Sequence, residues 1–193
     1  MSFLKGIKKY DYILKTLLLG HEKAGKTIFL KRIWLYENYK DFQQLSKEYR
    51  RTTERDFKFC YKKFNDKIYE FQIWDSAGKE RFQSIKKAFY KGAHIILIFY
   101  DAYDKDSFRL AKSTYKQLLP LNNKAVYFLI RNKYELSLNS EKKEIISDEE
   151  ALEFADKNNL IFVHLSSFEN YGNGIDNLFD IILKENILRT SNI

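Results

Sequence analysis

The sequence predicts an α/β domain built on a six-stranded, mostly parallel sheet with helices on both faces. Continuous apolar runs of strand length alternate with helical patterns along the chain, as expected for strands that are buried on both faces of a parallel sheet. The runs at 56–64 and 68–74 are separated only by Asn65-Asp66-Lys67, which predicts a hairpin and therefore one antiparallel strand. Such alternation gives three layers, with ligands bound outside the carboxyl ends of the strands.

Each element has a local reason. Strands are predicted where apolar residues run without interruption or alternate, at 12–19, 56–64, 68–74, 93–100, 125–130 and 161–165. Helices are predicted at 26–36, 83–91, 104–119, 147–158 and 174–189, which makes about five. Pro120 ends the third helix, because proline cannot continue it. Ser147 and Glu150 form a capping-box pattern at the start of the fourth helix, and the last helix carries an apolar stripe.

Composition limits the class of protein. A chain of 193 residues fits one domain with one core of ordinary size. The single cysteine, Cys60, permits no internal disulfide, so a reducing compartment is expected. No apolar run is long enough to span a bilayer. The net charge of +8 comes from basic residues scattered among many acids, which favours a solvated basic surface, and no nucleic-acid partner is expected.

The chain is organised around a glycine-containing loop that follows an apolar strand and opens a helical pattern, which is the context that a phosphate-binding loop requires. The loop reads Gly20-His21-Glu22-Lys23-Ala24-Gly25-Lys26-Thr27. Gly20 and Gly25 let backbone N–H groups turn inward around phosphate oxygens, and the helix start adds partial positive charge. Lys26 can reach the outer phosphates, and the Thr27 hydroxyl can bind Mg²⁺. Residues from Gly20 to Ile28 are therefore predicted to contact a nucleoside triphosphate.

A second cluster follows the strand at 68–74. Asp75 stands at the end of that strand, where a carboxylate can hold Mg²⁺ beside the phosphate loop, through water. Gly78 has no side chain, so its N–H can approach the terminal phosphate closely. The sequence therefore predicts a Mg²⁺ site between Thr27 and Asp75.

Polar residues after two later strands are suited to a purine base. Asn132 can hydrogen-bond a purine and brace the phosphate loop, and the stem of Lys133 can lie over the base. Glu135 can accept two hydrogen bonds from the edge of guanine, which adenine cannot supply. A backbone N–H beyond the last strand can meet the base oxygen. The residues there are Ser166, Ser167 and Phe168.

These motifs resemble those of the small GTPases of the Ras superfamily, and most closely those of its Rab branch. The most specific stretches are 20–27, 73–82 and 89–94, and Asp56-Phe57 resembles the end of the Rab switch I motif. The resemblance covers a core of about 10–188 in a single G domain, 1–193. It implies the P-loop NTPase fold, binding of GTP and GDP with Mg²⁺, and two nucleotide-dependent switch segments. It also implies that Thr52 binds Mg²⁺ and the γ-phosphate.

Departures from the family cluster where the chemistry takes place. Lys79 stands where the family has the glutamine that orients the attacking water, and a lysine has only donors. With Lys79, Thr52 and Gly78 as the residues around the reacting phosphate, slow or absent intrinsic hydrolysis is predicted. Glu22 and Lys23 occupy loop positions where small residues are usual. The Glu22 carboxylate repels the γ-phosphate unless a lysine pairs with it, or else both side chains point to solvent.

Three further departures concern the base and switch I. Glu135 replaces the aspartate of the family and Phe168 replaces a lysine, so contacts to guanine are softened. Switch I is longer than in the family. It carries Arg50 and Arg51, and either a solvated charge run or an arginine finger in cis is consistent with them. An aromatic residue of this extension can stack on the base.

The sequence leaves two main hypotheses. The first is a divergent Rab-like GTP/GDP switch that regulates vesicle traffic through effector proteins, exchange factors and activating factors. The second is a pseudo-GTPase, a binding module or scaffold held in one nucleotide state. An ATP-using P-loop enzyme is disfavoured by the guanine-type motif. The segment 188–193 has no cysteine for prenylation. The expectation is a cytoplasmic monomer, peripheral on endomembranes through a partner or a missing anchor.

Overall fold

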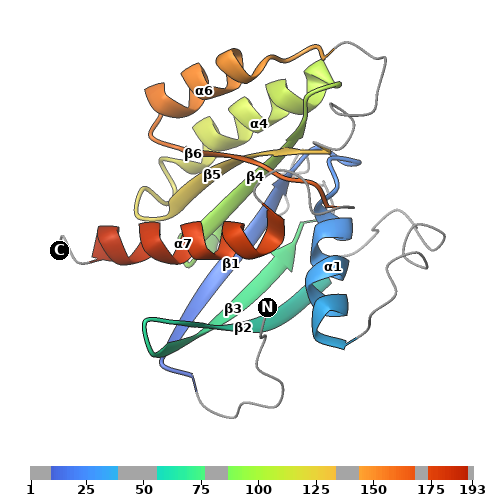
Figure 1. The fold of residues 1–193 in the computed structure, drawn as a ribbon. Helices are drawn as coiled ribbons and strands as arrows, with labels where there is room; N and C mark the ends of the chain where they lie inside the picture. The colour runs from blue at the N-terminus through green and yellow to red at the C-terminus, as the bar shows by residue number, and fades with distance from the viewer. Residues whose placement is uncertain (1–9, 39–55, 77–86, 134–143, 168–173, 191–193) are drawn as a thin grey trace.

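The structure is a computed structural model that describes residues 10–38, 56–76, 87–133, 144–167 and 174–190 (Figure 1). The strands are β1 Tyr12–Gly20, β2 Asp56–Phe64, β3 Lys67–Asp75, β4 Ile95–Asp101, β5 Val126–Asn132 and β6 Ile161–His164. The helices are α1 Lys26–Asn38, α3 Lys87–Lys91, α4 Lys105–Leu118, α6 Asp148–Lys157 and α7 Gly174–Thr190.

The strands form one sheet of six in the order β2-β3-β1-β4-β5-β6. All neighbouring pairs are parallel except β2 with β3, which is antiparallel. The predicted six-stranded, mostly parallel sheet with one antiparallel strand and about five helices is therefore confirmed. The hairpin turn is shorter than expected. Lys67 already pairs with Phe64, and the turn is made by Asn65 and Asp66, whose φ angles are 48° and 58°.

Two apolar cores lie on opposite faces of the sheet. Residues of α1 and α7, including Phe29 and Phe179, pack with strand residues in one core. Residues of α4 and α6, including Phe108 and Ala151, pack in the other. Figure 1 shows the pair α4 and α6 on one side of the sheet and α7 on the other. The candidate site residues that the structure describes lie at the carboxyl ends of the parallel strands and in the first turn of α1.

Helix starts follow the local signals in the sequence. The carboxylate of Asp104 accepts hydrogen bonds from the N–H groups of Asp106 and Ser107, which fixes the start of α4. The hydroxyl of Ser147 accepts from the N–H of Glu150 at the start of α6, as the capping pattern predicts. Within the described residues, no helix is both long and apolar enough to cross a membrane.

Candidate nucleotide-binding site

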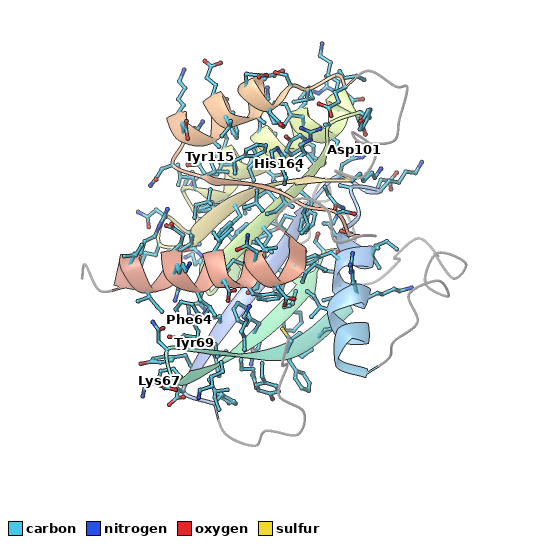
Figure 2. All side chains as sticks on the ribbon, viewed as in Figure 1. Phe64, Lys67, Tyr69, Asp101, Tyr115 and His164 are labelled. Carbon is cyan, nitrogen blue, oxygen red and sulfur yellow. The ribbon has the colours of Figure 1, made fainter. Side chains whose placement is uncertain are left out.

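The candidate site lies at the carboxyl ends of the parallel strands. The phosphate-binding loop follows β1, and β3, β4 and β5 end at Asp75, Asp101 and Asn132. Figure 2 shows Asp101 and His164 well apart from Phe64, Lys67 and Tyr69, which mark the opposite end of the sheet at the β2–β3 turn. Because parallel strands all end at one edge, residues far apart in the sequence meet at this site.

The phosphate-binding loop has a backbone that only certain residues tolerate. Gly20, Lys23 and Gly25 have φ angles of 125°, 70° and 91°, in the left-handed region. A Cβ on Gly20 would lie 2.1 Å from the carbonyl oxygen of Phe99, and one on Gly25 would lie 1.9 Å from Nδ2 of Asn132. The two glycines therefore let the loop approach β4 and β5 closely. A loop with this alternation of conformations is suited to cradling an anion.

A buried cation lies within this loop. The side chain of Lys26 is 4% exposed, and its Nζ donates to the carbonyl oxygens of Gly20 at 2.6 Å and His21 at 2.8 Å. The loop thus holds the ammonium group at the start of α1, where the partial positive charge of the helix adds to it. Both charges favour a phosphate group at this position.

Thr27 in the first turn of α1 contacts Asp75 at the end of β3. The hydroxyl of Thr27 donates to Oδ2 of Asp75 at 2.6 Å, and Asp75 is completely buried. The backbone N–H and the hydroxyl of Ser76 both donate to the carbonyl oxygen of Leu18, at 3.3 and 2.9 Å, which fixes the turn after Asp75. A hydroxyl and a carboxylate are hard oxygen ligands suited to Mg²⁺.

The chemistry of this pair fits Mg²⁺ bound mainly by phosphate and water. In the part of the chain that the structure describes, no cluster of three or more histidine, cysteine, aspartate or glutamate side chains could hold a metal. Mg²⁺ commonly takes one or two protein ligands and completes its shell with water and substrate phosphates. Thr27 and Asp75 would therefore hold the ion beside the phosphate-binding loop, where it would neutralise phosphate charge.

Asn132 joins the loop after β1 to the segment after β6, which is a candidate for base binding. Its Nδ2 donates to the carbonyl oxygen of Ala24 at 2.8 Å. Its Oδ1 accepts from the N–H and the hydroxyl of Ser167, at 3.0 and 2.9 Å. Asn132 and Ser167 are both buried. One amide therefore fixes the distance between the loop after β1 and the loop after β6.

Lys133 has a partner that the sequence analysis did not find. Its Nζ lies 2.5 Å from Oδ2 of Asp101, and its own φ angle is 62°. Asp101 is in turn held by Ser107, whose hydroxyl lies 3.0 Å from the Asp101 N–H. The ion pair with Asp101 therefore holds the Lys133 side chain beside the end of β4. An acidic residue ending a fully apolar strand was the sequence signal that could have indicated Asp101.

The segment after β6 is also held by a hydrogen bond from Arg32 of α1. Arg32 of α1 is 6% exposed, and its Nη1 donates to the carbonyl oxygen of Ser166 at 3.4 Å. Ser166 is itself completely buried. A charged residue among the apolar positions of α1 was the sequence signal for this contact. Arg32 thereby links α1 to the segment after β6.

The remaining predicted residues divide into two groups. Of the loop residues, Glu22 is half-buried and Lys23 is exposed, and Nδ1 of His21 lies 3.5 Å from the carboxylate of Asp104. Ile28 is buried in the first turn of α1. The others fall outside the described residues: Arg50, Arg51, Thr52, Gly78, Lys79, Glu135 and Phe168.

Comparison with known proteins assigns the family. A model of the Ras family matches residues 15–188. This chain belongs to the Ras family. It is 32% identical over 163 residues to GTP-binding protein YPT1 of Saccharomyces cerevisiae, covering 84% of this chain and 74% of the relative. It is 34% identical over 160 residues to GTP-binding protein YPTM2 of Zea mays, covering 82% and 73%. Ras-related protein Rab-1 of Theileria parva is 32% identical over 163 residues, covering 83% and 69%.

These relatives make the chain a divergent, Rab-like member of the family. Proteins of the Ras family bind GTP and GDP with Mg²⁺ as a class. The geometry of Lys26, Thr27 and Asp75 fits that class. Lys26 and Thr27 lie in the first turn of α1, and Asp75 ends β3.

Proposed function

We propose that this chain is a Rab-like, Mg²⁺-dependent GTP/GDP switch that regulates vesicle traffic through effector proteins. The observation that carries the proposal is Asn132, whose one amide joins the phosphate-binding loop at Ala24 to the segment at Ser167. This contact supports the proposal because it brings the candidate phosphate-binding and base-binding segments together. Guanine specificity follows from Glu135, whose carboxylate accepts from the guanine edge, and from membership in the Ras family.

A group of exposed aromatic side chains on β2 and β3 supports the effector role. Phe57 and Phe59 are 37% and 52% exposed. Phe57 lies against Trp74, with ring centroids 4.4 Å apart, and Trp74 lies 5.8 Å from Phe89 of α3. Exposed aromatic side chains that gather on one surface mark protein-binding sites. This surface joins the strand after switch I to the helix after switch II, so an effector docked there can read both.

Intrinsic hydrolysis is proposed to be slow, because Lys79 lacks the acceptor that orients water. A second candidate function is a binding module that keeps one nucleotide state, and Glu22 and Lys79 favour it. Exchange factors and activating factors are the proposed partners of the first candidate, and a cytoplasmic chain peripheral on endomembranes is the proposed location for both.

Nucleotide identity and single-turnover hydrolysis test the proposal. Nucleotide extracted from the purified protein is expected to be GTP or GDP, and adenine nucleotide would overturn the proposal. The rate of GTP hydrolysis is then measured for the wild type, for Lys79→Gln and for Lys91→Gln, a lysine change on α3 as the matched control. A rate that rises about tenfold in Lys79→Gln alone supports a weakened switch. No hydrolysis in any of the three favours the binding module.

A further inference from the structure

A lysine of β1 holds the end of α3, near the start of β4 and away from the nucleotide-binding end of the sheet. The ammonium group of Lys15 donates to the carbonyl oxygen of Phe89 at 2.7 Å. The same Nζ lies 4.7 Å from the centre of the Phe89 ring. The last carbonyl groups of a helix have no partner within it, and an aromatic face attracts cations. One cation therefore holds both the backbone and the ring of Phe89.

The second member of this group is His94, which directly precedes β4. Its Nδ1 accepts a hydrogen bond from the backbone N–H of Lys15 at 2.9 Å, and its own N–H donates to the carbonyl oxygen of Lys15 at 2.9 Å. A ring nitrogen can accept a hydrogen bond only when it carries no proton. The contact therefore requires a neutral imidazole with its hydrogen on Nε2.

Phe89 connects this pair to the aromatic surface of Phe57, Phe59 and Trp74. The rings of Phe89 and Trp74 lie at right angles, with centroids 5.8 Å apart, and the Trp74 ring lies 4.4 Å from that of Phe57. The indole Nε1 of Trp74 is buried and has no hydrogen-bond partner within the described residues. Packing against aromatic neighbours therefore sets the position of the indole, and Phe89 is one of these neighbours.

We propose that Lys15 and neutral His94 are positioning residues that hold Phe89 against Trp74, and that acid loosens the aromatic surface by protonating His94. The role in partner binding rests on the proposed function, whereas the contacts themselves do not. An imidazolium group has a donor on each ring nitrogen, so Nδ1 would turn a hydrogen toward the N–H of Lys15. Its charge would also repel the ammonium group that holds Phe89. Both changes act through Lys15.

The surroundings of His94 favour its neutral form at neutral pH. Partial burial and the charge of Lys15 hold the pKa of His94 below its ordinary value. The charged residues at the near ends of the other adjoining elements are also cations: Lys91 ends α3, Lys116 lies in the last turn of α4 and Lys124 precedes β5. Protonation is therefore expected only below pH 6.5, the ordinary pKa of a histidine.

The simpler role for these contacts is stability of the fold. Another residue already holds the turn between α3 and β4. Asn122 is buried, and its Nδ2 donates to the carbonyl oxygens of Tyr90 and Ala93, both at 2.8 Å. The turn therefore stays attached when the contacts of Lys15 are lost, whereas Phe89 loses the hydrogen bond and the ring contact that Lys15 provides. The two roles predict different spectra for a tryptophan beside Phe89.

The test follows the fluorescence of Trp74 in the full chain. Trp34→Phe is the background of every variant, so that Trp74 is the only tryptophan. Emission is recorded from about pH 8 to about pH 4.5, beside far-UV circular dichroism, for His94→Asn and His94→Ala. Asparagine offers an acceptor that does not titrate, and alanine offers none. His164→Asn is the matched control, because His164 lies on β6 and contacts Asp148.

A shift of Trp74 emission to longer wavelength, half complete below pH 6.5, is expected in the background and in His164→Asn, because water reaches an indole whose neighbour has moved. His94→Asn should keep the neutral-pH spectrum throughout. His94→Ala should show the shifted spectrum throughout, and Lys15→Met should show it at neutral pH with unchanged GDP affinity.

A shift that persists in His94→Asn would mean that another group titrates, and would overturn the proposal. Neutral-pH spectra equal to the background in both His94→Ala and Lys15→Met would assign the contacts to stability alone, and would also overturn it. A background protein that binds no guanine nucleotide would overturn the proposed function instead, and would leave the spectra of Trp74 as evidence on the positioning of Phe89.

Discussion

The phosphate end and the base end of this site are built in different ways. At the phosphate end, the positive φ angles of Gly20 and Gly25 and the contacts of Lys26 with Gly20 and His21 all lie within a few residues of one loop. At the base end, Asn132 depends on Ser167, and Arg131 depends on Glu144 and Asp148. One end is a backbone shape, and the other is an assembly of side chains from several elements.

This difference predicts how each end fails. The backbone of the loop cannot adjust to an added side-chain atom without losing its conformation, so one such atom should abolish phosphate binding. An assembly of side chains can lose one contact and retain the others, so changes at the base end should alter affinity and selectivity by degrees. Substitutions at each end, each paired with a similar substitution elsewhere in the chain, test this difference.

The largest effect is expected for Gly25→Ala. The added Cβ would lie 1.9 Å from Nδ2 of Asn132, at a φ angle of 91° that L residues rarely adopt. Fluorescent GDP titration should show affinity reduced by at least about 100-fold. Gly92→Ala is the control, because a Cβ there would meet only Nζ of Lys15, at 3.6 Å. Affinity that is equal in the two variants would contradict a backbone shape that excludes any side chain.

A smaller loss is expected for Asn132→Ala. The substitution leaves the carbonyl of Ala24 and the N–H of Ser167 without this partner, and groups of that kind cost roughly 1–3 kcal/mol when buried. Asn122 is an unusually close control. It is also buried, and its side chain also makes three hydrogen bonds, with Tyr90, Ala93 and Ala125, but it lies away from the site.

Both asparagine variants should therefore lose similar stability to chemical unfolding. Only Asn132→Ala should also lose nucleotide affinity beyond that, by about tenfold. The two affinities are compared under conditions in which both variants are fully folded. Equal nucleotide affinity would then mean that Asn132 only stabilises the fold. The joining role assigned to it would then be wrong.

Thr27→Ala should change the response to Mg²⁺ more than the affinity itself. Without the hydroxyl that now contacts Asp75 at 2.6 Å, one of the three proposed metal-binding residues, Thr27, Thr52 and Asp75, is lost. Nucleotide release in the presence of Mg²⁺ should become about tenfold faster, and adding EDTA should then accelerate it little further. Thr27→Ser keeps the hydroxyl and should behave as the wild type. A large EDTA effect that persists in Thr27→Ala would remove Thr27 from the metal site.

The same contrast explains what the sequence could predict. Every strand, and the helix starts at Asp104 and Ser147, follow local patterns, and these were predicted close to where the structure has them. The phosphate-binding loop could be identified for the same reason. Asp101 stands out in the sequence at the end of an apolar strand, but its pairing with Lys133 and the network at Arg131 could not be predicted. Their contacts join elements distant in sequence, and spacing carries no information about which side chains meet across a sheet.

The smallest effect expected is a dependence of stability on pH at the base end. Burial acts to raise the pKa of Asp148, but hydrogen bonds from His164 and Arg131 outweigh it and hold that pKa below its usual value. A carboxyl group whose pKa is lower in the folded protein adds stability above its unfolded pKa, and this contribution is lost as pH falls through the folded value. Asp148→Asn should therefore lower the free energy of unfolding at neutral pH.

The loss should be about 1 kcal/mol or less, since the Asp148 side chain is 34% exposed and solvent screens its contacts. The difference between Asp148→Asn and the wild type should shrink as pH falls below about 3.9, the usual pKa of the unfolded carboxyl group. It should disappear only below the lowered pKa of the folded protein, where the carboxyl group is protonated in both states. A pH-independent difference for Asp148→Asn would mean that the asparagine disturbs packing, and that charge does not hold the base end together.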